Sequence, residues 1–188
     1  MSQSEVTVQL KKVHPDAITP SYAKPLDAGF DLRAVEDVVV SPGQTVKIPT
    51  GIAIALPPGH EVQVRPRSGV SEKTKLRVSN APGTGDAGLR GEICVLIDNI
   101  AQLMPNAVID GEISFSTGPL LGIEGKPTAY RPVGYEDETF YKRTYVIRKG
   151  ERIAQGVLAI VKQAVFEEVD ELDKTERGED GFGSSGTR

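Results

Sequence analysis

The chain has 188 residues, 26% of them charged, and a formal net charge of −4 at pH 7. This length fits a single domain with a real core, and the negative charge argues against nucleic acid or an anionic membrane as the main partner. No apolar run reaches the ~18 residues of a membrane span, and the polar start of the chain lacks a signal-peptide core. Because Cys94 is the only cysteine, no internal disulfide can form, and we expect a cytoplasmic protein.

Short β-branched or alternating segments, separated by Gly and Pro, predict a protein built from strands. Thirteen prolines argue against long helices, so Val165–Leu172 is expected to form at most a turn or two of helix. The predicted fold class is all-β, as a compact sandwich or jelly roll. The expected strands are Val6–Leu10, Val38–Val40, Val46–Pro49, Gly51–Leu56, Glu61–Val64, Glu92–Ile97, Thr144–Ile147 and Gly156–Val161.

Two places in the first half of the chain carry polar groups in a setting that suits a ligand. Asp31, between apolar residues and shortly after a glycine, either closes a turn or holds water around a magnesium ion. In the segment Arg65–Val70, Arg67 and Ser68 offer donors to phosphate, and Gly69 exposes its N–H. The alternative for this segment is a strand-to-turn corner with a surface arginine.

The segment Asn80–Glu92 is predicted to be a tight hairpin, because its glycines permit a bend that ordinary residues could not adopt. Asp86 is the only carboxylate before Glu92, and we place it at the bend. A lone Asp in a Gly-rich hairpin is usually only a turn former, so this segment by itself does not establish a catalytic group.

Residues from about 100 to 143, here called the insertion, hold five of the ten aromatic side chains. Gly and Pro interrupt this stretch repeatedly, which predicts irregular or hairpin-rich structure. One interpretation is a satellite cluster that packs against the main sheet. The other is a docking surface for a partner protein, because Tyr concentrates at recognition surfaces.

After the insertion, Gly150–Gln155 leads into an apolar strand, and its Glu and Arg could be no more than a surface pair. The final segment, Arg177–Gly186, contains four glycines and one aromatic residue and cannot bury enough apolar surface to fold by itself. Its Arg suits phosphate, its Phe offers a stacking face, and its two Ser supply further phosphate donors. It is either a frayed terminus or an arm that closes over a phosphorylated, flat-ringed ligand.

Taken together and in this order, five segments resemble the five motifs of the trimeric dUTPase family. The similarity spans nearly the whole chain outside the insertion, and five ordered motifs are far more specific than any one of them. The matching segments are Ala28–Ala34, Pro66–Gly69, Asn80–Glu92, Gly150–Gln155 and Arg177–Gly186.

The resemblance implies a distorted jelly roll, or β-clip, that forms a homotrimer. It also implies hydrolysis of dUTP to dUMP and pyrophosphate, with Mg²⁺ on the triphosphate and each active site assembled from three subunits. The expected division of the chain is a single β domain at 1–176, containing the insertion, and a flexible arm at 177–188 that closes the site.

The resemblance assigns the base end of the substrate to the third motif. Asp86 corresponds to the carboxylate that activates the water attacking the α-phosphate. Asn80 corresponds to the residue that hydrogen-bonds the uracil edge, beside the backbone of Gly83 and Thr84. Leu89 stands where the family usually has a Tyr that packs on the deoxyribose, which predicts weaker rejection of a 2′-hydroxyl.

The other motifs are assigned to the phosphates, the metal and the outer face of the base. Phe182, followed by Gly183, is expected to stack over uracil. Asp31 is expected to reach Mg²⁺ through water, because this ion dehydrates reluctantly. The residues expected at the phosphates are Arg67, Ser68, Gly69, Gln155, Arg177, Ser184 and Ser185.

Two further departures from the motifs bear on catalysis. Gly85 stands where an Ile is common, which predicts a loss of the packing that would fix the neighbouring catalytic Asp. Asp180 replaces a usual Gly in the tail and adds negative charge near a polyanion. Two alternatives to hydrolysis stay open: deamination of dCTP, as in relatives that share the jelly roll, and a nucleotide-sensing protein whose insertion holds a partner.

Overall fold

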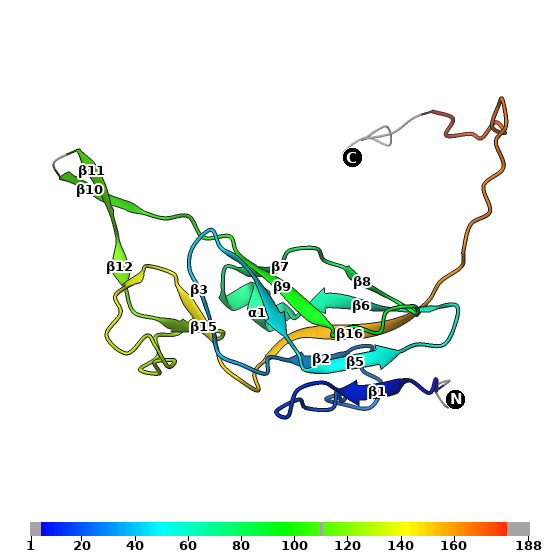
Figure 1. Cartoon of the computed structure of the whole chain (residues 1–188). Coiled ribbons are helices and arrows are strands. Elements are labelled where there is room, and N and C mark those ends of the chain that lie inside the picture. The colour runs from blue at the N-terminus through cyan, green and yellow to red at the C-terminus, as the bar shows by residue number, and fades with distance from the viewer. Residues whose placement is uncertain (1–4, 110, 180–188) are drawn as a thin grey trace.

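The computed structural model describes residues 5–109 and 111–179, and within them its regular structure is almost entirely β (Figure 1). The all-β prediction is therefore confirmed. The largest sheet has four antiparallel strands in the order β2-β16-β6-β8. Its strands are β2 (Phe30–Arg33), β16 (Arg152–Ile160), β6 (His60–Pro66) and β8 (Gly83–Asp86).

Two three-stranded sheets and one two-stranded sheet complete the body of the molecule. The first three-stranded sheet contains β4 (Thr45–Pro49), β9 (Cys94–Asn99) and β7 (Leu76–Val78). The second contains β13 (Leu121–Gly122), β15 (Tyr145–Ile147) and β3 (Val38–Val40). The pair is β1 (Gln9–Lys12) with β5 (Ile52–Ala55).

Side chains from these sheets meet in one apolar core. Leu32, Val62, Ile48 and Val95 each come from a different strand, and each is at most 1% exposed. Along β4 and β6 these buried residues alternate with less buried neighbours, which is the period-2 pattern that the sequence carries. Burial of this apolar surface is what holds the sheets face to face.

All eight predicted strands overlap an observed one, although the first lies mostly C-terminal to its prediction, at β1. The sequence reasoning missed a short helix, α1 (Ser68–Lys73), and several short strands of the body, among them β2, β7 and β8. The turn or two of helix that the sequence allowed for Val165–Leu172 does not form. This stretch is extended and exposed, because it packs against no other part of the described chain that could repay the cost of forming a helix.

The insertion divides into a docked base and a projecting hairpin. The hairpin, β10 (Pro105–Ile109) with β11 (Glu112–Phe115), extends away from the sheets in Figure 1. The base contains the pair β12 (Thr117–Gly118) and β14 (Phe140–Tyr141), and it reaches the main body where β13 joins β15. The predicted hairpin-rich insertion is therefore confirmed in its local structure.

Specific contacts fix the base of the insertion to the body. Leu120, Phe140 and Val146 form a small buried cluster of their own, as the satellite interpretation expected. The buried Asn99 side chain donates to the carbonyl oxygen of Arg143 at 2.8 Å and accepts from the N–H of Ala101 at 3.1 Å, so that it ties the two ends of the insertion together.

A hydroxyl of the insertion also meets a carboxylate of the body. Tyr130 donates a hydrogen bond to Asp37, and this bond raises the pKa of the Tyr130 hydroxyl above its usual value. The guanidinium of Arg148 lies over the same ring, 5.7 Å from its centroid. The base of the insertion is therefore held by packing and by polar contacts together.

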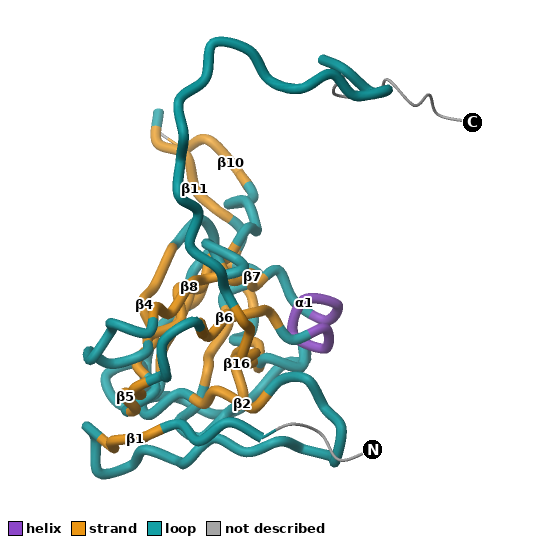
Figure 2. The backbone as a smooth tube through the Cα atoms, turned by 90° about the vertical axis from the view of Figure 1, so that its right-hand side faces the viewer, coloured by secondary structure: helices purple, strands orange, loops and turns teal. Residues whose placement is uncertain are grey.

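After β16 the chain leaves the body as an extended segment, residues 161–179, called the C-terminal extension below. Figure 2 shows it running far beyond the sheets. Every residue in it is exposed, and Val165, Phe166 and Leu172 are at least 84% exposed. Among the described residues, no helix is long and apolar enough to cross a membrane.

Candidate active site

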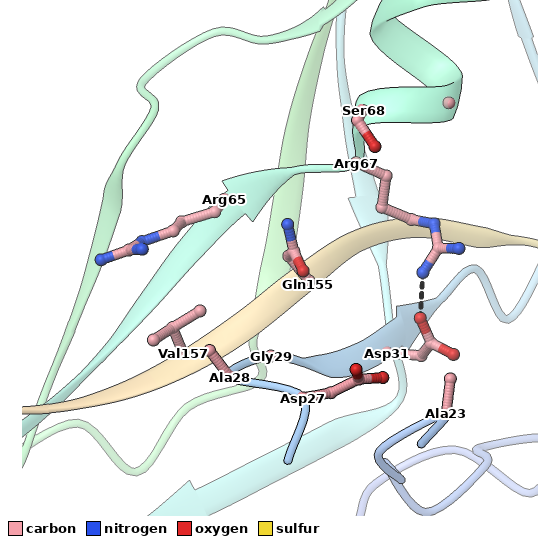
Figure 3. Close-up of a pocket in the computed structure, with 11 residues that line it drawn as sticks. Ala23, Asp27, Ala28, Gly29, Asp31, Arg65, Arg67, Ser68, Gln155 and Val157 are labelled. Carbon is pink, nitrogen blue, oxygen red and sulfur yellow. Dashed lines mark hydrogen bonds and ion pairs between the residues drawn. The ribbon is translucent and has the colours of Figure 1, made fainter. Parts of the chain in front are cut away.

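A cavity of about 340 Å³ opens where β2, β16 and β6 meet the start of α1 (Figure 3). Register explains why polar side chains gather there. Gln155 in β16 lies directly opposite Asp31 in β2 on one side and Arg65 in β6 on the other. Directly opposed residues share a face of the sheet, so these three form a polar row across three adjacent strands.

The carboxylate of Asp31 is buried and lies between two guanidinium groups. It accepts from Arg67 at one oxygen and from Nη1 of Arg152 at the other, the latter at 3.3 Å. Asp31 is 7% exposed, while the side chains of Arg67 and Arg152 are 27% and 44% exposed. The carboxylate therefore compensates two cations at the edge of the cavity and fixes their positions.

Gln155 is held in place on the floor of the cavity. Its Nε2 donates to the carbonyl oxygen of Pro66 at 2.9 Å. A Cβ atom at Gly29 would lie 2.6 Å from Oε1 of Gln155, so the absence of a side chain at residue 29 makes room for the amide. Ser68 and Gly69 complete the cavity wall, which brings all of the predicted phosphate residues of the second and fourth motifs together.

The start of α1 differs from the strand-to-turn corner that was the alternative interpretation of Arg65–Val70. Arg67 is the residue that precedes the helix, in an extended conformation, and Ser68 and Gly69 form its first turn. The N–H groups of Val70 and Ser71 are both directed to the carbonyl oxygen of Arg67. The segment is thus a strand-to-helix junction, a change that puts a basic side chain and a hydroxyl at one rim.

The third motif lies elsewhere in the chain, and the hairpin predicted for it is wrong. β8 pairs with β6, whereas β9 pairs with β4 and β7 in another sheet. Asp86 is the exposed last residue of β8, and its carbonyl oxygen accepts from the N–H of Leu89 at 3.0 Å. Asp86 does begin a turn, but this turn connects two sheets rather than two strands of one hairpin.

The register of β6 separates the two groups of predicted site residues. Asp86 lies opposite Glu61 at one end, and Arg67 follows Pro66 at the other. Arg67 lies six residues beyond Glu61, and six residues of a strand span about 20 Å. Asp86, Asn80, Gly83, Thr84 and Leu89 do not line the cavity that holds Arg67 and Gln155. One chain, as described, does not bring its predicted catalytic carboxylate to its predicted phosphate site.

Gly85 does not leave the gap that the sequence reasoning expected. A Cβ atom there would lie 2.5 Å from Cγ1 of Val62, and Val62 itself is 1% exposed. The space is therefore filled from the neighbouring strand, and the backbone next to Asp86 is paired with Val62 in the β6–β8 ladder. Packing lost from one side chain is replaced by another.

The tail residues divide at the limit of the described chain. Arg177 lies in the C-terminal extension, while Asp180, Phe182, Gly183, Ser184 and Ser185 lie outside the described residues. Sequence reasoning assigned no site role to Asp27, Arg65 or Arg152, of which the first two line the cavity and the third contacts Asp31. The cross-strand pairing of Arg65 with Gln155 could have revealed one of them, had the strand register been known.

The comparisons with known proteins agree on one family. The dUTPase family model matches residues 16–104 and 139–186 and leaves 105–138, most of the insertion, unmatched. The deoxyuridine 5′-triphosphate nucleotidohydrolase of Syntrophotalea carbinolica is 39% identical over 183 residues, covering 96% of this chain and 97% of that protein. The enzyme of the same name from Caulobacter vibrioides is 41% identical over 175 residues, covering 91% of this chain and 87% of that protein.

Solved structures give the same result. The dUTPase of Staphylococcus bacteriophage 80alpha, in a structure with dUpNHpp, superposes with a TM-score of 0.81 at 33% identity, covering 96% of this chain and 98% of that one. The dUTPase from phage phi11 of S. aureus, whose structure visualises a species-specific insert, has a TM-score of 0.76 at 27% identity, covering 90% and 99%. With the ordered motifs and the polar cavity, these matches establish that the chain belongs to the dUTPase family.

Proposed function

We infer that this protein is a dUTP diphosphatase, which hydrolyses dUTP to dUMP and pyrophosphate. The observation that carries the assignment is the polar row Asp31–Gln155–Arg65, closed by Arg67 and Ser68, in a chain that belongs to the dUTPase family. The relatives named above are nucleotidohydrolases, which favours hydrolysis over dCTP deamination and over a purely sensing protein.

We propose that the cavity binds the phosphate chain. Arg67 supplies a planar, permanently charged fork, and Ser68 and the N–H of Gly69 supply further donors to phosphate oxygens. The amide of Gln155 lies between Asp31 and Arg65 in the polar row, where it can donate to a phosphate oxygen or orient a water. Holding these groups in a fixed geometry before the substrate arrives lowers the entropic cost of the reaction.

At the other end of β6, we propose that Asn80 and the backbone of Gly83 and Thr84 bind the uracil edge. The Asp86 carboxylate would take the proton of the water that attacks the α-phosphate, and the O–P bond to the pyrophosphate leaving group would break. Leu89 follows in the turn after Asp86 and would face the deoxyribose. Because Asp86 is exposed at the end of β8, another surface must cover it to complete a binding site.

This second surface is the basis for proposing a homotrimer. Within one chain, Asp86 and Arg67 lie at opposite ends of β6, about 20 Å apart along the strand. If the cavity of one subunit faces the β8 end of another, base and phosphate residues meet around one substrate. A closed homo-oligomer makes such an arrangement repeat identically at every subunit.

The C-terminal extension supports the same assembly. Its exposed apolar side chains, among them Phe166 and Leu172, need a surface to cover them, and a neighbouring subunit would provide one. We propose that residues 177–188 then close over the nucleotide, with Arg177, Ser184 and Ser185 at the phosphates and Phe182, followed by Gly183, stacked on uracil. The single β domain would end at residue 176.

Mg²⁺ is proposed as the companion of the triphosphate. Asp31 does not fit a direct ligand, because both of its oxygens already accept from guanidinium groups. Each carboxylate oxygen keeps a second lone pair, so contact through a water of the ion stays a prediction. The phosphates themselves would supply the inner ligands, and the chemistry the ion would add is neutralisation of charge on the substrate.

The projecting hairpin of the insertion is proposed to bind a protein partner. Val108 and Ile113 are 70% and 57% exposed, and an isolated two-stranded hairpin is marginally stable in water. A pull-down with the intact chain and with a variant in which a short Gly-Ser turn replaces β10–β11 tests this proposal. The proposal is contradicted if both capture the same proteins.

A cytoplasmic location remains a prediction from the lone cysteine.

The reaction is tested by incubating the protein with dUTP and Mg²⁺ beside an Asp86→Asn variant and separating the products. The wild type should release dUMP and pyrophosphate, and the variant should lose roughly 10²- to 10⁴-fold in kcat, the range typical of a lost general base. Binding of dUpNHpp should stay within about threefold, a change of less than ~0.7 kcal/mol. A variant that retains wild-type kcat would remove Asp86 from the mechanism.

A further inference from the structure

The helix α1 stands between two cavities. Arg67, which precedes the helix, and Gly69 in its first turn line the proposed phosphate cavity on one side. The same two residues line a second cavity of about 370 Å³ on the other side. The wall of this second cavity also contains Ile123 and Glu124, which belong to the insertion. The insertion therefore lies directly behind the proposed phosphate-binding segment.

A glycine turn of the insertion approaches α1. The N–H of Gly125 donates to the carbonyl oxygen of Gly122, and the N–H of Gly122 donates to that of Lys126, each at 2.9 Å. This turn lies against the C-terminal end of α1. A Cβ atom at Gly125 would overlap the carbonyl oxygen of Lys73, a backbone atom that cannot rotate away as a side chain would.

The glycine turn and the C-terminal end of α1 are each held in place by further contacts. Past the end of α1, the N–H of Lys75 donates to the hydroxyl of Tyr145 at 3.1 Å. On the other side, Leu121 precedes the turn and pairs with Tyr145 in the sheet. The turn and the end of α1 are thus both anchored to the same strand, β15, and this shared anchor fixes the distance between them.

We propose that the turn Gly122–Lys126 positions α1, and through it Arg67, Ser68 and Gly69, for binding the triphosphate. Because α1 has only six residues, from Ser68 to Lys73, a displacement at its C-terminal end is carried to its first turn with little loss. Ile123 and Val70 both pack against the main core from this region, which makes the contact part of the packed interior. A segment that the family model does not match thereby sets the geometry of a family motif.

The test compares Gly125→Ala with Gly134→Ala. Both glycines lie in the insertion at positive φ, +73° and +87°, but a Cβ atom at Gly134 would meet no atom of the described residues within 4 Å. The two variants therefore share the backbone strain and differ in the clash with α1. Ile123→Ala is a milder second variant that loosens the same contact if Gly125→Ala folds poorly.

The readout is the ratio of the dissociation constants for dUpNHpp and dUMP. A displaced phosphate segment should weaken the triphosphate analogue by about tenfold and dUMP by less than about twofold, since tenfold corresponds to ~1.4 kcal/mol. Gly134→Ala should leave both constants at the wild-type values. A general loss of folding would weaken both ligands together, which thermal unfolding of the same samples detects.

The inference rests on the proposed phosphate role of Arg67–Gly69, and Ser68→Ala tests that role separately. If Ser68→Ala weakens dUpNHpp while Gly125→Ala and Ile123→Ala leave the ratio unchanged, the positioning role is wrong and the phosphate assignment stands. If Ser68→Ala itself leaves the ratio unchanged, the phosphate assignment fails. A raised ratio in Gly125→Ala and Ile123→Ala, with Gly134→Ala unchanged, supports the inference.

Discussion

Asp31 accepts hydrogen bonds from Arg67 at one carboxylate oxygen and from Arg152 at the other, and so joins the first, second and fourth motifs at one point. The contact between Asp31 and Arg67 spans 36 positions of sequence. A carboxylate in this position offsets the repulsion between the two guanidinium groups at the cavity edge, because it attracts both of them. We therefore expect the main role of Asp31 to be the positioning of Arg67 rather than contact with a metal ion.

Asp31→Asn is therefore expected to cost both stability and activity. Loss of the buried charge leaves two cations uncompensated, and the free energy of unfolding should fall by about 1–3 kcal/mol. The KM for dUTP should rise at saturating Mg²⁺. Asp16→Asn is the matched control, because its ion pair with Lys149 at 3.2 Å is half-exposed, and such pairs contribute at most about 1 kcal/mol.

A titration with Mg²⁺ separates the two roles of Asp31. If the carboxylate positions Arg67, the defect of the Asn variant persists at every Mg²⁺ concentration. Full recovery at high Mg²⁺ would show instead that the carboxylate acts on the ion, as the sequence reasoning expected.

Mixing two inactive variants should restore activity if base and phosphate residues come from different subunits. Asp86→Asn and Arg67→Gln disable opposite ends of β6. In randomly mixed equimolar oligomers each site draws its two halves independently, so about a quarter of the sites should be intact. Asp86→Asn mixed with Asn80→Ala should recover nothing, because both changes lie in the same motif. Mixed oligomers without recovery in the first pair would show that one chain supplies the whole site.

Leu89→Tyr should sharpen the choice between dUTP and UTP. Leu89 is 40% exposed in the turn that begins at Asp86, and it lacks the flat ring that would cover the deoxyribose. We expect the ratio of kcat/KM for dUTP over UTP to rise by roughly tenfold, the scale of a pocket contact of one or two carbons. Leu89→Phe separates the ring from the hydroxyl, and an unchanged ratio in both variants would remove this residue from sugar recognition.

Gly85→Ala should destabilise the protein, although the family commonly has Ile at this position. The new Cβ would lie 2.5 Å from Cγ1 of Val62, and overpacking of this kind costs about 1–3 kcal/mol. Val62→Ala removes the obstructing methyl groups, so the double variant should be more stable than the sum of the single changes allows. Chemical denaturation of the four proteins measures this coupling, and strict additivity would contradict it.

The case of Gly85 shows how far a family pattern can be read from one chain. The motif comparison identified the missing side chain correctly, but the consequence drawn from it was wrong, because the compensating Val62 is 23 positions away in sequence and adjacent only in the sheet. The hairpin expected in Asn80–Glu92 failed for a related reason. Glycines mark where a chain can bend, but they do not say which strand the bend leads to.

The sequence by itself determined the family, the all-β class and eight of the sixteen strands that the structure describes, because five ordered motifs and the period-2 burial pattern are local properties of the chain. It also identified the groups that suit phosphate and uracil. Only the tertiary structure decided which of them meet: Asp31, Gln155 and Arg65 align through strand register, Arg67 pairs with Asp31, and Asp86 lies at the far end of β6. The physical reason is that register and long-range packing are set by the burial of distant side chains, which no local pattern records.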